Sequence, residues 1–325
     1  MRTFKKHEYE LFCNIASVNQ EALKGVLAKY LKKKYKKVEV TNDYIVAHGR
    51  IPIALVAHMD TVFKEPPKEF FYDTTKNVMW SPEGLGADDR AGVFAILSII
   101  ESGLRPHIIF TTDEEVGGIG AMKLATAGNP FKDLRYMIQL DRRGTSDCVF
   151  YDCDNQEFEA YVEEFGFQTA WGSFSDISEL CPEWGIAGVN LSIGYQDEHS
   201  YTERLYVAPL LSTIGKVKKM LSEKDIPSFK YIPSVYSYGY SWKTGYANLY
   251  IKCAGCGKHF YEEDLFPVKM LDGSTKLYCT DCVTDPKNKI TFCDVCYESF
   301  EYAHEDCIPS FCDKCEREAL MKGAI

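Results

Sequence analysis

The sequence predicts a layered α/β domain with a mixed central sheet flanked by helices, followed by a small cysteine-rich domain. Before residue 225, short apolar β-branched runs alternate with loops and helical patterns, as in folds that cover a sheet with helices. After residue 250, the apolar periodicity fades and cysteine pairs take over. With 325 residues, the chain has the length of two domains of ~150 residues each.

We assign residues 1–225 to the first domain, 226–250 to a connector and 251–325 to the cysteine-rich domain. The connector contains six tyrosines and one tryptophan. Aromatic side chains at this density favour burial, which is not typical of a flexible linker. We therefore expect the connector to pack as an arm on one of the domains, and a dedicated recognition surface is the alternative.

Charge and hydropathy exclude several classes of function. The chain has 37 Lys and Arg against 47 Asp and Glu, and its net charge of -10 disfavours nucleic acid as a partner. No apolar run approaches the ~18 to 20 residues that span a bilayer. The first residues also lack the apolar core of a signal peptide. We expect a cytoplasmic protein that has no membrane partner.

The first domain begins with helical spacing over residues 8–34, which ends in a lysine run of the kind favoured at a helix C-terminus. Residues 38–40 and 44–47 flank a polar turn and predict a short hairpin. A second helical pattern covers residues 91–100.

Four apolar runs with the character of buried strands lead into side chains that can bind a metal. Because ligands bind beyond the carboxyl ends of strands in open α/β sheets, the four ends can converge on one crevice. The runs and their polar residues are 51–57 with His58 and Asp60, 107–112 with Glu114 and Glu115, 136–140 with Asp141, and 187–193 with His199.

A fifth acidic element lies just before the helical pattern at 91–100. Asp88 and Asp89 follow glycines that permit a tight turn, and a helix N-terminus favours their negative charge. Each element alone is weak, since acidic residues often cap helices. Together they form a cluster of anions that requires a cation. The sequence thus predicts a metal site, in which either Asp88 or Asp89 can bridge two ions.

The residue blocks that carry this chemistry resemble, in the same order, the signature blocks of the co-catalytic dizinc exopeptidases. This superfamily includes peptidase T, glutamate carboxypeptidases, the tetrahedral aminopeptidases and the bacterial leucyl aminopeptidases. The resemblance covers about residues 50–210, and its blocks are Ala57-His58-Met59-Asp60-Thr61-Val62, Gly86-Ala87-Asp88-Asp89-Arg90-Ala91-Gly92, Thr112-Asp113-Glu114-Glu115-Val116-Gly117 and Asp141.

The resemblance implies the dizinc peptidase fold and a set of five ligands. By it, His58 and Asp141 hold one zinc ion, Glu115 and His199 hold the other, and Asp88 bridges the two. Mixed histidine and carboxylate sites also accept Mn²⁺ or Co²⁺, so the catalytic metal is left open.

Two further residues complete the implied machinery. A histidine ligand usually donates its other ring N–H to a carboxylate, and the resemblance gives Asp60 that place beside His58. It gives Glu114 the role of general base, which accepts a proton from a water whose pKa zinc lowers toward ~7. The implied reaction is hydrolysis of an amide bond.

The chain departs from larger members of the superfamily. Asp141 and His199 are only 58 positions apart, which leaves no room for a lid or dimerisation insertion. The compact aminopeptidase-like form fits best, and the oligomeric state is open. Arg142 and Arg143 could bind a substrate carboxylate, although a structural salt bridge is the favoured interpretation. Asp176, in a serine-aspartate loop, is expected to border the site.

The cysteine-rich domain predicts two structural zinc sites. Four C-x-x-C pairs with gaps of 22 and 15 residues are typical of sites with four thiolates each. Sequential pairing, first with second and third with fourth, requires only local closure and is favoured over a cross-braced arrangement. The pairs are Cys253 and Cys256, Cys279 and Cys282, Cys293 and Cys296, and Cys312 and Cys315.

These features predict a zinc-dependent metallopeptidase or amidohydrolase, most simply an aminopeptidase-type exopeptidase. Its substrate would be a small peptide or an N-acyl amino acid. The alternative is a catalytically silent scaffold whose zinc-ribbon tail binds a protein partner. A scaffold has no need of Glu114, which counts against that alternative.

Overall fold

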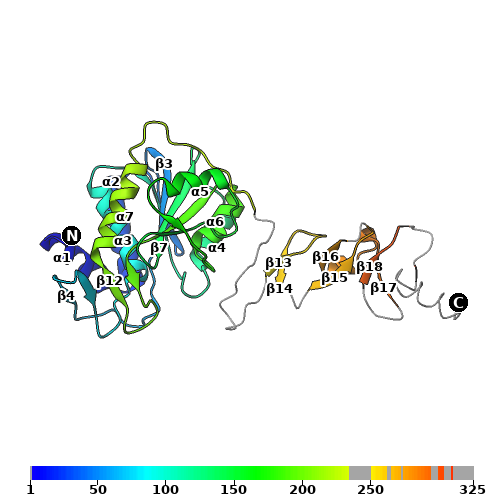
Figure 1. The fold of residues 1–325 in the computed structure, drawn as a ribbon, viewed down its shortest axis with the longest axis horizontal. Helices are drawn as coiled ribbons and strands as arrows, with labels where there is room; N and C mark the ends of the chain where they lie inside the picture. Colours follow the sequence, from blue (N-terminus) through cyan, green and yellow to red (C-terminus); the bar gives the residue numbers. More distant parts are fainter. Residues whose placement is uncertain are drawn as a thin grey trace. The chain divides into compact units, whose positions relative to one another are not determined.

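The structure, a computed structural model, describes residues 2–233, 250–261, 265–271, 274–293, 299–303 and 309. The chain divides into two units, Met1–Tyr236 and Ser237–Ile325, each with its own strands and core (Figure 1). No helix in the described ranges is long and apolar enough to cross a membrane.

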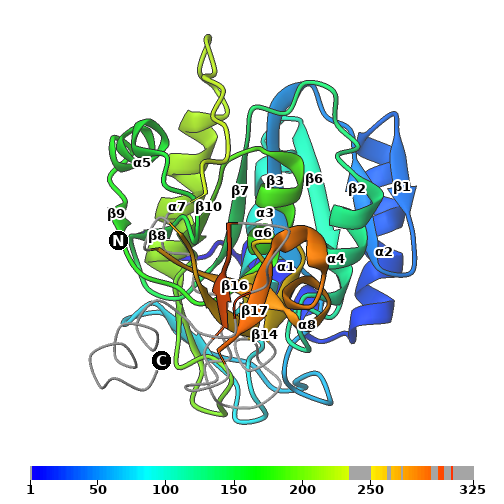
Figure 2. The ribbon, with the colours of Figure 1, turned by 90° about the vertical axis from the view of Figure 1, so that its right-hand side faces the viewer.

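An eight-stranded mixed sheet organises the first unit, in the order β1-β2-β6-β3-β7-β10-β8-β9 (Figure 2). Its four central strands are parallel, β2 and β8 join them antiparallel, and β9 runs parallel to β8. The strands are β1 (Val38–Val40), β2 (Tyr44–Ala47), β3 (Ile51–His58), β6 (Pro106–Thr111), β7 (Tyr136–Arg142), β8 (Asp147–Val149), β9 (Gln168–Thr169) and β10 (Gly188–Ser192).

Helices cover both faces of this sheet, which is why its central strands are apolar along their whole length. In β3, Leu55 packs into a core shared with α1, α2, α3, α5 and α7, whereas Val56 faces the core formed with α4 and α6. The helices are α1 (Lys6–Ala16), α2 (Gln20–Lys34), α3 (Ala87–Glu101), α4 (Ile119–Ala127), α5 (Gln156–Glu163), α6 (Asp176–Trp184) and α7 (Val207–Met220). The predicted α/β fold with a mixed, helix-flanked sheet is confirmed.

A second, four-stranded sheet lies in the same unit, in the order β11-β12-β5-β4. The loop between β11 and β12 carries His199, so this sheet holds one of the predicted ligands. Its strands are β4 (Phe71–Asp73), β5 (Val78–Trp80), β11 (Tyr195–Gln196) and β12 (Arg204–Tyr206).

The predicted hairpin is confirmed, whereas the single helical region over residues 8–34 is two helices. β1 and β2 pair antiparallel, with Val38 opposite Ala47. The helical region breaks between α1 and α2, where the side chain of Asn19 accepts a hydrogen bond from the backbone N–H of Ala22. This cap pairs a backbone N–H that has no partner within the first turn of α2, so a new helix begins here.

The start of the predicted connector packs on the first unit. Ile226 and Phe229 are buried in its larger core, and Lys230 and Pro233 form bridges with Ile186 and Cys153. Residues 234–249 lie outside the described ranges.

The second unit contains a two-stranded and a four-stranded sheet around a small core. The four-stranded sheet has the order β16-β15-β18-β17. Three of the seven buried core residues are cysteines, so apolar burial alone supplies little stability here. The elements are β13 (Tyr250–Lys252), β14 (His259–Tyr261), β15 (Leu265–Lys269), β16 (Thr275–Cys279), α8 (Thr280–Val283), a 3-10 turn (Pro286–Asn288), β17 (Ile290–Phe292) and β18 (Ser299–Glu301).

A buried histidine in β6 makes the first unit sensitive to acid. His107 Nδ1 accepts a hydrogen bond from the backbone N–H of Gly49 at 3.1 Å, and His107 Nε2 lies 3.2 Å from Asp133 Oδ1. Because a backbone N–H can only donate, Nδ1 is unprotonated, and adding a proton there breaks this bond. Burial lowers the pKa of His107, with Asp133 acting in the opposite direction.

We expect the contribution of His107 to the free energy of unfolding to fall as the pH is lowered below about 6.5, the ordinary imidazole pKa. In this pH range the imidazole of His107 is protonated in the unfolded chain but remains neutral in the folded chain, so acid favours unfolding through this residue. His107→Gln should remove this contribution. Its size in the free energy of unfolding is ~1.4 kcal/mol for each unit by which the pKa of His107 is lower in the folded chain than in the unfolded chain. Urea unfolding at about pH 7.5 and about pH 5 measures it.

The matched control is His7→Gln, because His7 is an exposed residue of α1. It should keep the pH dependence of the natural chain. Equal pH dependence for His107→Gln and the natural chain would contradict the assignment.

Candidate metal centre

The predicted ligands come together at the carboxyl edge of the parallel strands. His58 is the last residue of β3, and Asp141 lies near the end of the neighbouring strand β7. Asp88 lies in the first turn of α3, after Gly86 with φ +64°, a conformation that glycine adopts without strain. His58, Asp88 and Asp141 offer ligand atoms within 4.8 Å of one another.

Asp88 lies between two histidines, with one carboxylate oxygen toward each. Its Oδ1 is 3.1 Å from His58 Nε2, and its Oδ2 is 3.2 Å from His199 Nε2. His58 Nε2 is also 3.5 Å from Asp141 Oδ1. This is the geometry in which a carboxylate can serve two neighbouring ions.

A second group of ligand atoms contains Asp88, Glu115 and His199, again within 4.8 Å. His199 Nε2 lies 3.0 Å from Glu115 Oε2. The other oxygen of Glu115, Oε1, is buried without a hydrogen-bond partner in the described part of the chain. A buried carboxylate oxygen without a donor is costly, and a cation would relieve that cost.

Asp60 fixes both His58 and the acidic pair that follows β6. Its Oδ1 is 3.2 Å from His58 Nδ1, and its oxygens accept hydrogen bonds from the backbone N–H groups of Glu114 and Glu115. With Nδ1 engaged in this way, His58 Nε2 is free to bind a metal. Glu114 belongs to neither ligand group, and its Oε2 lies 4.0 Å from His58 Nε2.

The first unit is similar to known peptidases in both sequence and structure. Residues 45–177 match the model of peptidase family M28. A tripeptidase from Staphylococcus aureus has a similar structure, with 15% identity and a TM-score of 0.53 over 67% of this chain and 97% of that chain. The resemblance to the co-catalytic dizinc exopeptidases is confirmed.

Two further solved structures share the dizinc exopeptidase fold. A TET aminopeptidase from a marine-sediment Thaumarchaeota archaeon is 13% identical, with a TM-score of 0.53 over 68% of this chain and 98% of that chain. Aminopeptidase PepT from Bacillus cereus is 15% identical, with a TM-score of 0.50 over 66% and 97%. No curated protein matches the chain. The family match ends before His199, which is brought to the site by β11 and β12.

The electrostatics of this cluster favour the binding of cations. Burial raises the pKa of Asp141 to about 7, with Asp88 adding to the effect, and burial also raises the pKa of Glu115. The hydrogen bonds with Asp88 and Glu115 raise the pKa of His199 to about 11. The protein alone thus retains protons among these groups, and divalent cations can replace them.

The side chains of Asp88 and Asp89 differ in the groups that they contact. Asp89 is fully buried, and its Oδ1 accepts a hydrogen bond from the backbone N–H of Gly92 at 2.8 Å. It belongs to neither ligand group. The geometry therefore supports Asp88 as the bridging residue.

The structure also describes the contacts of Arg142, Arg143 and Asp176, which the sequence analysis places near the site. Arg143 forms a salt bridge with Glu198 at 2.8 Å, in line with the structural interpretation, and Arg142 donates to the carbonyl of Trp171. Asp176 is fully buried behind the site, where it accepts a hydrogen bond from the hydroxyl of Thr111 at 2.6 Å.

Several residues that support the ligands were not found by sequence reasoning. Asp141 accepts hydrogen bonds from Tyr195, Ser175 and Gln139. Glu203 is completely buried, and its carboxylate accepts from the backbone N–H groups of Ala87 and Asp88 at 3.1 and 3.0 Å. Glu203 follows His199 by four positions, but nothing in that spacing alone shows that its partner is a turn 115 residues away.

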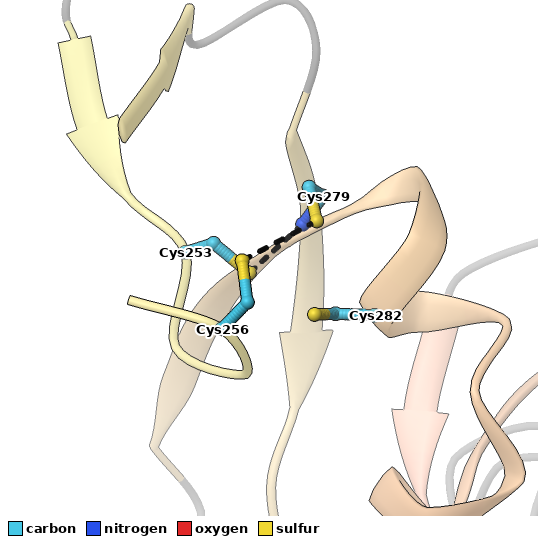
Figure 3. A group of neighbouring side chains, drawn as sticks. All are labelled: Cys253, Cys256, Cys279 and Cys282. Atoms are coloured by element: carbon cyan, nitrogen blue, oxygen red, sulfur yellow. Dashed lines mark hydrogen bonds between the residues drawn. The ribbon is translucent and has the colours of Figure 1, made fainter. Parts of the chain in front are cut away.

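The second unit contains a separate group of four thiols. Cys253, Cys256, Cys279 and Cys282 offer sulfur atoms within 4.8 Å of one another (Figure 3). The first C-x-x-C pair thus lies beside the second, as sequential pairing requires. Of the other pairs, Cys293 is buried, whereas Cys296, Cys312 and Cys315 lie outside the described residues.

We expect Glu203→Gln to weaken metal binding at the candidate metal centre by about tenfold. The amide can accept one of the two backbone hydrogen bonds, but its NH₂ group opposes the other, so the Asp88 turn loosens. Equilibrium dialysis of the full chain against Mn²⁺ measures the affinity.

Glu198→Gln is the matched control, because Glu198 lies on the same loop but pairs with Arg143 at the surface. It should change the affinity little. Equal affinities for the two variants would remove Glu203 from the support of the metal centre.

Proposed function

We propose that the protein is a dizinc metallopeptidase of the aminopeptidase type, which hydrolyses small peptides or N-acyl amino acids. The observation that carries this proposal is the placement of Asp88, whose two oxygens face His58 and His199 in two adjoining ligand groups. The M28 family match supports peptidase activity.

The proposed metals fit the residues that surround them. His58 and Asp141 would hold one ion, Glu115 and His199 the other, and Asp88 both, and the unpartnered Glu115 Oε1 supplies a further donor. When bound, such ions polarise an amide carbonyl and lower the pKa of water. Zinc favours this donor set, which also accepts Mn²⁺ or Co²⁺.

Glu114 is placed to move the proton. Its carboxylate is buried beside the ligand groups, and burial raises its pKa well above the ordinary value, with Asp141 and Asp176 adding to the effect. In the proposed reaction, Glu114 Oε2 accepts a proton from the attacking water and donates it to the leaving nitrogen. Asp60 keeps this side chain in place through the backbone of Glu114.

The charge of the site favours the amino end of a peptide. Besides the fully buried Asp89, six acidic side chains surround it, and two divalent cations offset only four of their negative charges. The remaining negative charge attracts a protonated α-amino group and repels a carboxylate. The similar solved structures include aminopeptidases and a tripeptidase, which is consistent with short peptides as substrates. The acidic residues are Asp60, Asp88, Glu114, Glu115, Asp141 and Asp176.

We also propose that the thiol group of the second unit holds a structural zinc ion. Four cysteines close the coordination shell of zinc and leave no position for a substrate. Such an ion would supply the stability that the small core around Cys253 and Cys279 lacks. A second such site, from Cys293, Cys296, Cys312 and Cys315, stays a prediction.

Glu114→Gln should lower kcat by ~10² to 10⁴-fold, the range typical of a lost general base, while both metals remain bound. The substitution removes proton acceptance but keeps the shape of the side chain. Hydrolysis of a tripeptide mixture, followed by mass spectrometry, reports the rate and also the end that is trimmed.

Glu10→Gln provides the control, because Glu10 is an exposed residue of α1 that pairs with Lys6. Its activity should equal that of the natural chain. The peptidase assignment fails if the natural chain, loaded with zinc or manganese, releases no amino acid from any peptide in the mixture.

Cys253→Ser should remove one zinc ion per chain and lower the thermal stability of the second unit. The loss follows because a hydroxyl is a far weaker zinc ligand than a thiolate. Elemental analysis of chelator-free protein gives the zinc content, with Cys148→Ser, a buried cysteine of β8, as control. An unchanged zinc content in Cys253→Ser would contradict a metal site at these thiols.

A further inference from the structure

A cavity of about 230 Å³ lies beside the candidate metal centre, and none of the residues in the two ligand groups lines it. Its walls come from the turn between α1 and α2, the loop after β3 and the start of α3. Asp60, one of the wall residues, places its Oδ1 3.2 Å from His58 Nδ1 and accepts a hydrogen bond from the backbone N–H of Glu114. The cavity therefore adjoins the centre on the side where Asp60 supports His58 and Glu114.

Three polar side chains of the wall are engaged within the protein. Asp60 is engaged by the contacts just described. The side-chain amide of Gln20 donates to Asp113 Oδ1 at 2.9 Å and accepts from the backbone N–H of Asp113 at 3.1 Å. Arg90 donates to the carbonyl of Val18, and its Nε and Nη1 are buried. The buried part of the wall thus offers no free charge to an occupant.

Apolar side chains supply most of the remaining wall. Lys64 also lines the cavity, but it is exposed, so its ammonium group can stay in water. A volume of about 230 Å³ is several times the ~30 Å³ share of one water molecule, so the side chain of a large apolar amino acid fits. The apolar wall residues are Ala16, Val18, Phe63, Pro66 and Pro67.

The ring of Phe63 connects this cavity to the loop that carries His199. On one side the ring lies over the backbone of Gly84, where any side chain would collide with it. On the other side it packs against the ring of Tyr201, with 5.5 Å between the ring centroids. Tyr201 follows His199 by two positions and is 71% exposed. The apolar surface of the cavity thus continues onto a loop of the metal centre.

We propose that this cavity binds the large apolar side chain of the second residue of a peptide substrate, such as leucine or phenylalanine. The inference rests on the proposed peptidase function, in which Glu114 donates a proton to the leaving nitrogen. That nitrogen belongs to the second residue, and the cavity adjoins Glu114 through Asp60. Burial of an apolar side chain stabilises the complex and brings no charge to the acidic site.

Tripeptides that differ only at the second residue test this specificity. For the zinc-loaded natural chain, we expect kcat/KM for Ala-Phe-Ala to exceed that for Ala-Gly-Ala by about tenfold or more, the range typical of an apolar pocket. Phe-Ala-Ala and Gly-Ala-Ala report the first residue in the same way. Equal values for Ala-Phe-Ala and Ala-Gly-Ala overturn the proposal, even if the first residue shows a preference.

Val18→Trp should abolish the preference for Ala-Phe-Ala, because the larger side chain fills the cavity, and should leave hydrolysis of Ala-Gly-Ala unchanged. The matched control is Val26→Trp, since Val26 is 58% exposed on α2 and does not line the cavity. It should keep the preference of the natural chain. A preference that survives Val18→Trp places the second side chain elsewhere and refutes the site.

Phe63→Ala removes the wall that faces Tyr201 and tests the site if Val18→Trp does not fold. It should lower the preference for Ala-Phe-Ala several-fold, because an apolar contact is lost. Phe71→Ala is its control, since Phe71 is an exposed phenylalanine that does not line the cavity. An unchanged preference in Phe63→Ala contradicts the proposal.

Binding of N-acetyl-phenylalanine amide to the metal-free full chain separates this inference from the proposed function. We expect ligand-observed NMR to detect binding by the natural chain and by Val26→Trp, and its loss in Val18→Trp. A chain that binds the amide in this way but hydrolyses no peptide retains the apolar site and loses the peptidase assignment. A chain that hydrolyses peptides but does not bind the amide retains the assignment and loses the site.

Discussion

The shared carboxylate of Asp88 is the interaction on which the rest of the site depends. Two histidines from different sheets approach it, His58 from the end of β3 and His199 from the loop that follows β11. Asp88 can serve both only if its turn is held in place, which Gly86 permits and Glu203 enforces through two backbone hydrogen bonds. The central sheet, the smaller sheet and α3 therefore meet at one side chain.

The same arrangement concentrates negative charge in a largely buried site. Burial raises the pKa of Asp141, of Glu114 and of Asp176, which measures the cost of holding these groups together. Cations bound at the two ligand groups would offset that cost, so we expect metal binding to stabilise the fold of this unit. Hydrogen bonds from Tyr195 and Ser175 to Asp141 direct the remaining lone pairs.

The second unit also brings metal-ligating side chains together, but these side chains are thiols. Its core is too small to be stable through apolar burial alone, and three of its buried residues are cysteines. Four thiols within 4.8 Å supply a cross-link if they hold an ion. In the proposed function, the carboxylates of the first unit would form a centre for hard cations that is open to substrate, whereas the four thiols would form a closed, structural site.

The sequence by itself determined the elements and the ligand types. The apolar run before His58 predicts a buried strand, and the hairpin at β1 and β2 follows from a polar turn between β-branched residues, because these patterns are local. The residue types alone could not decide between Asp88 and Asp89, since neighbouring carboxylates differ only in where the backbone directs them, and only the resemblance favoured Asp88. Nor could the sequence reveal that Glu203 holds the turn of Asp88. That role depends on contacts between segments far apart in the chain, which only the packing of sheets and helices brings together.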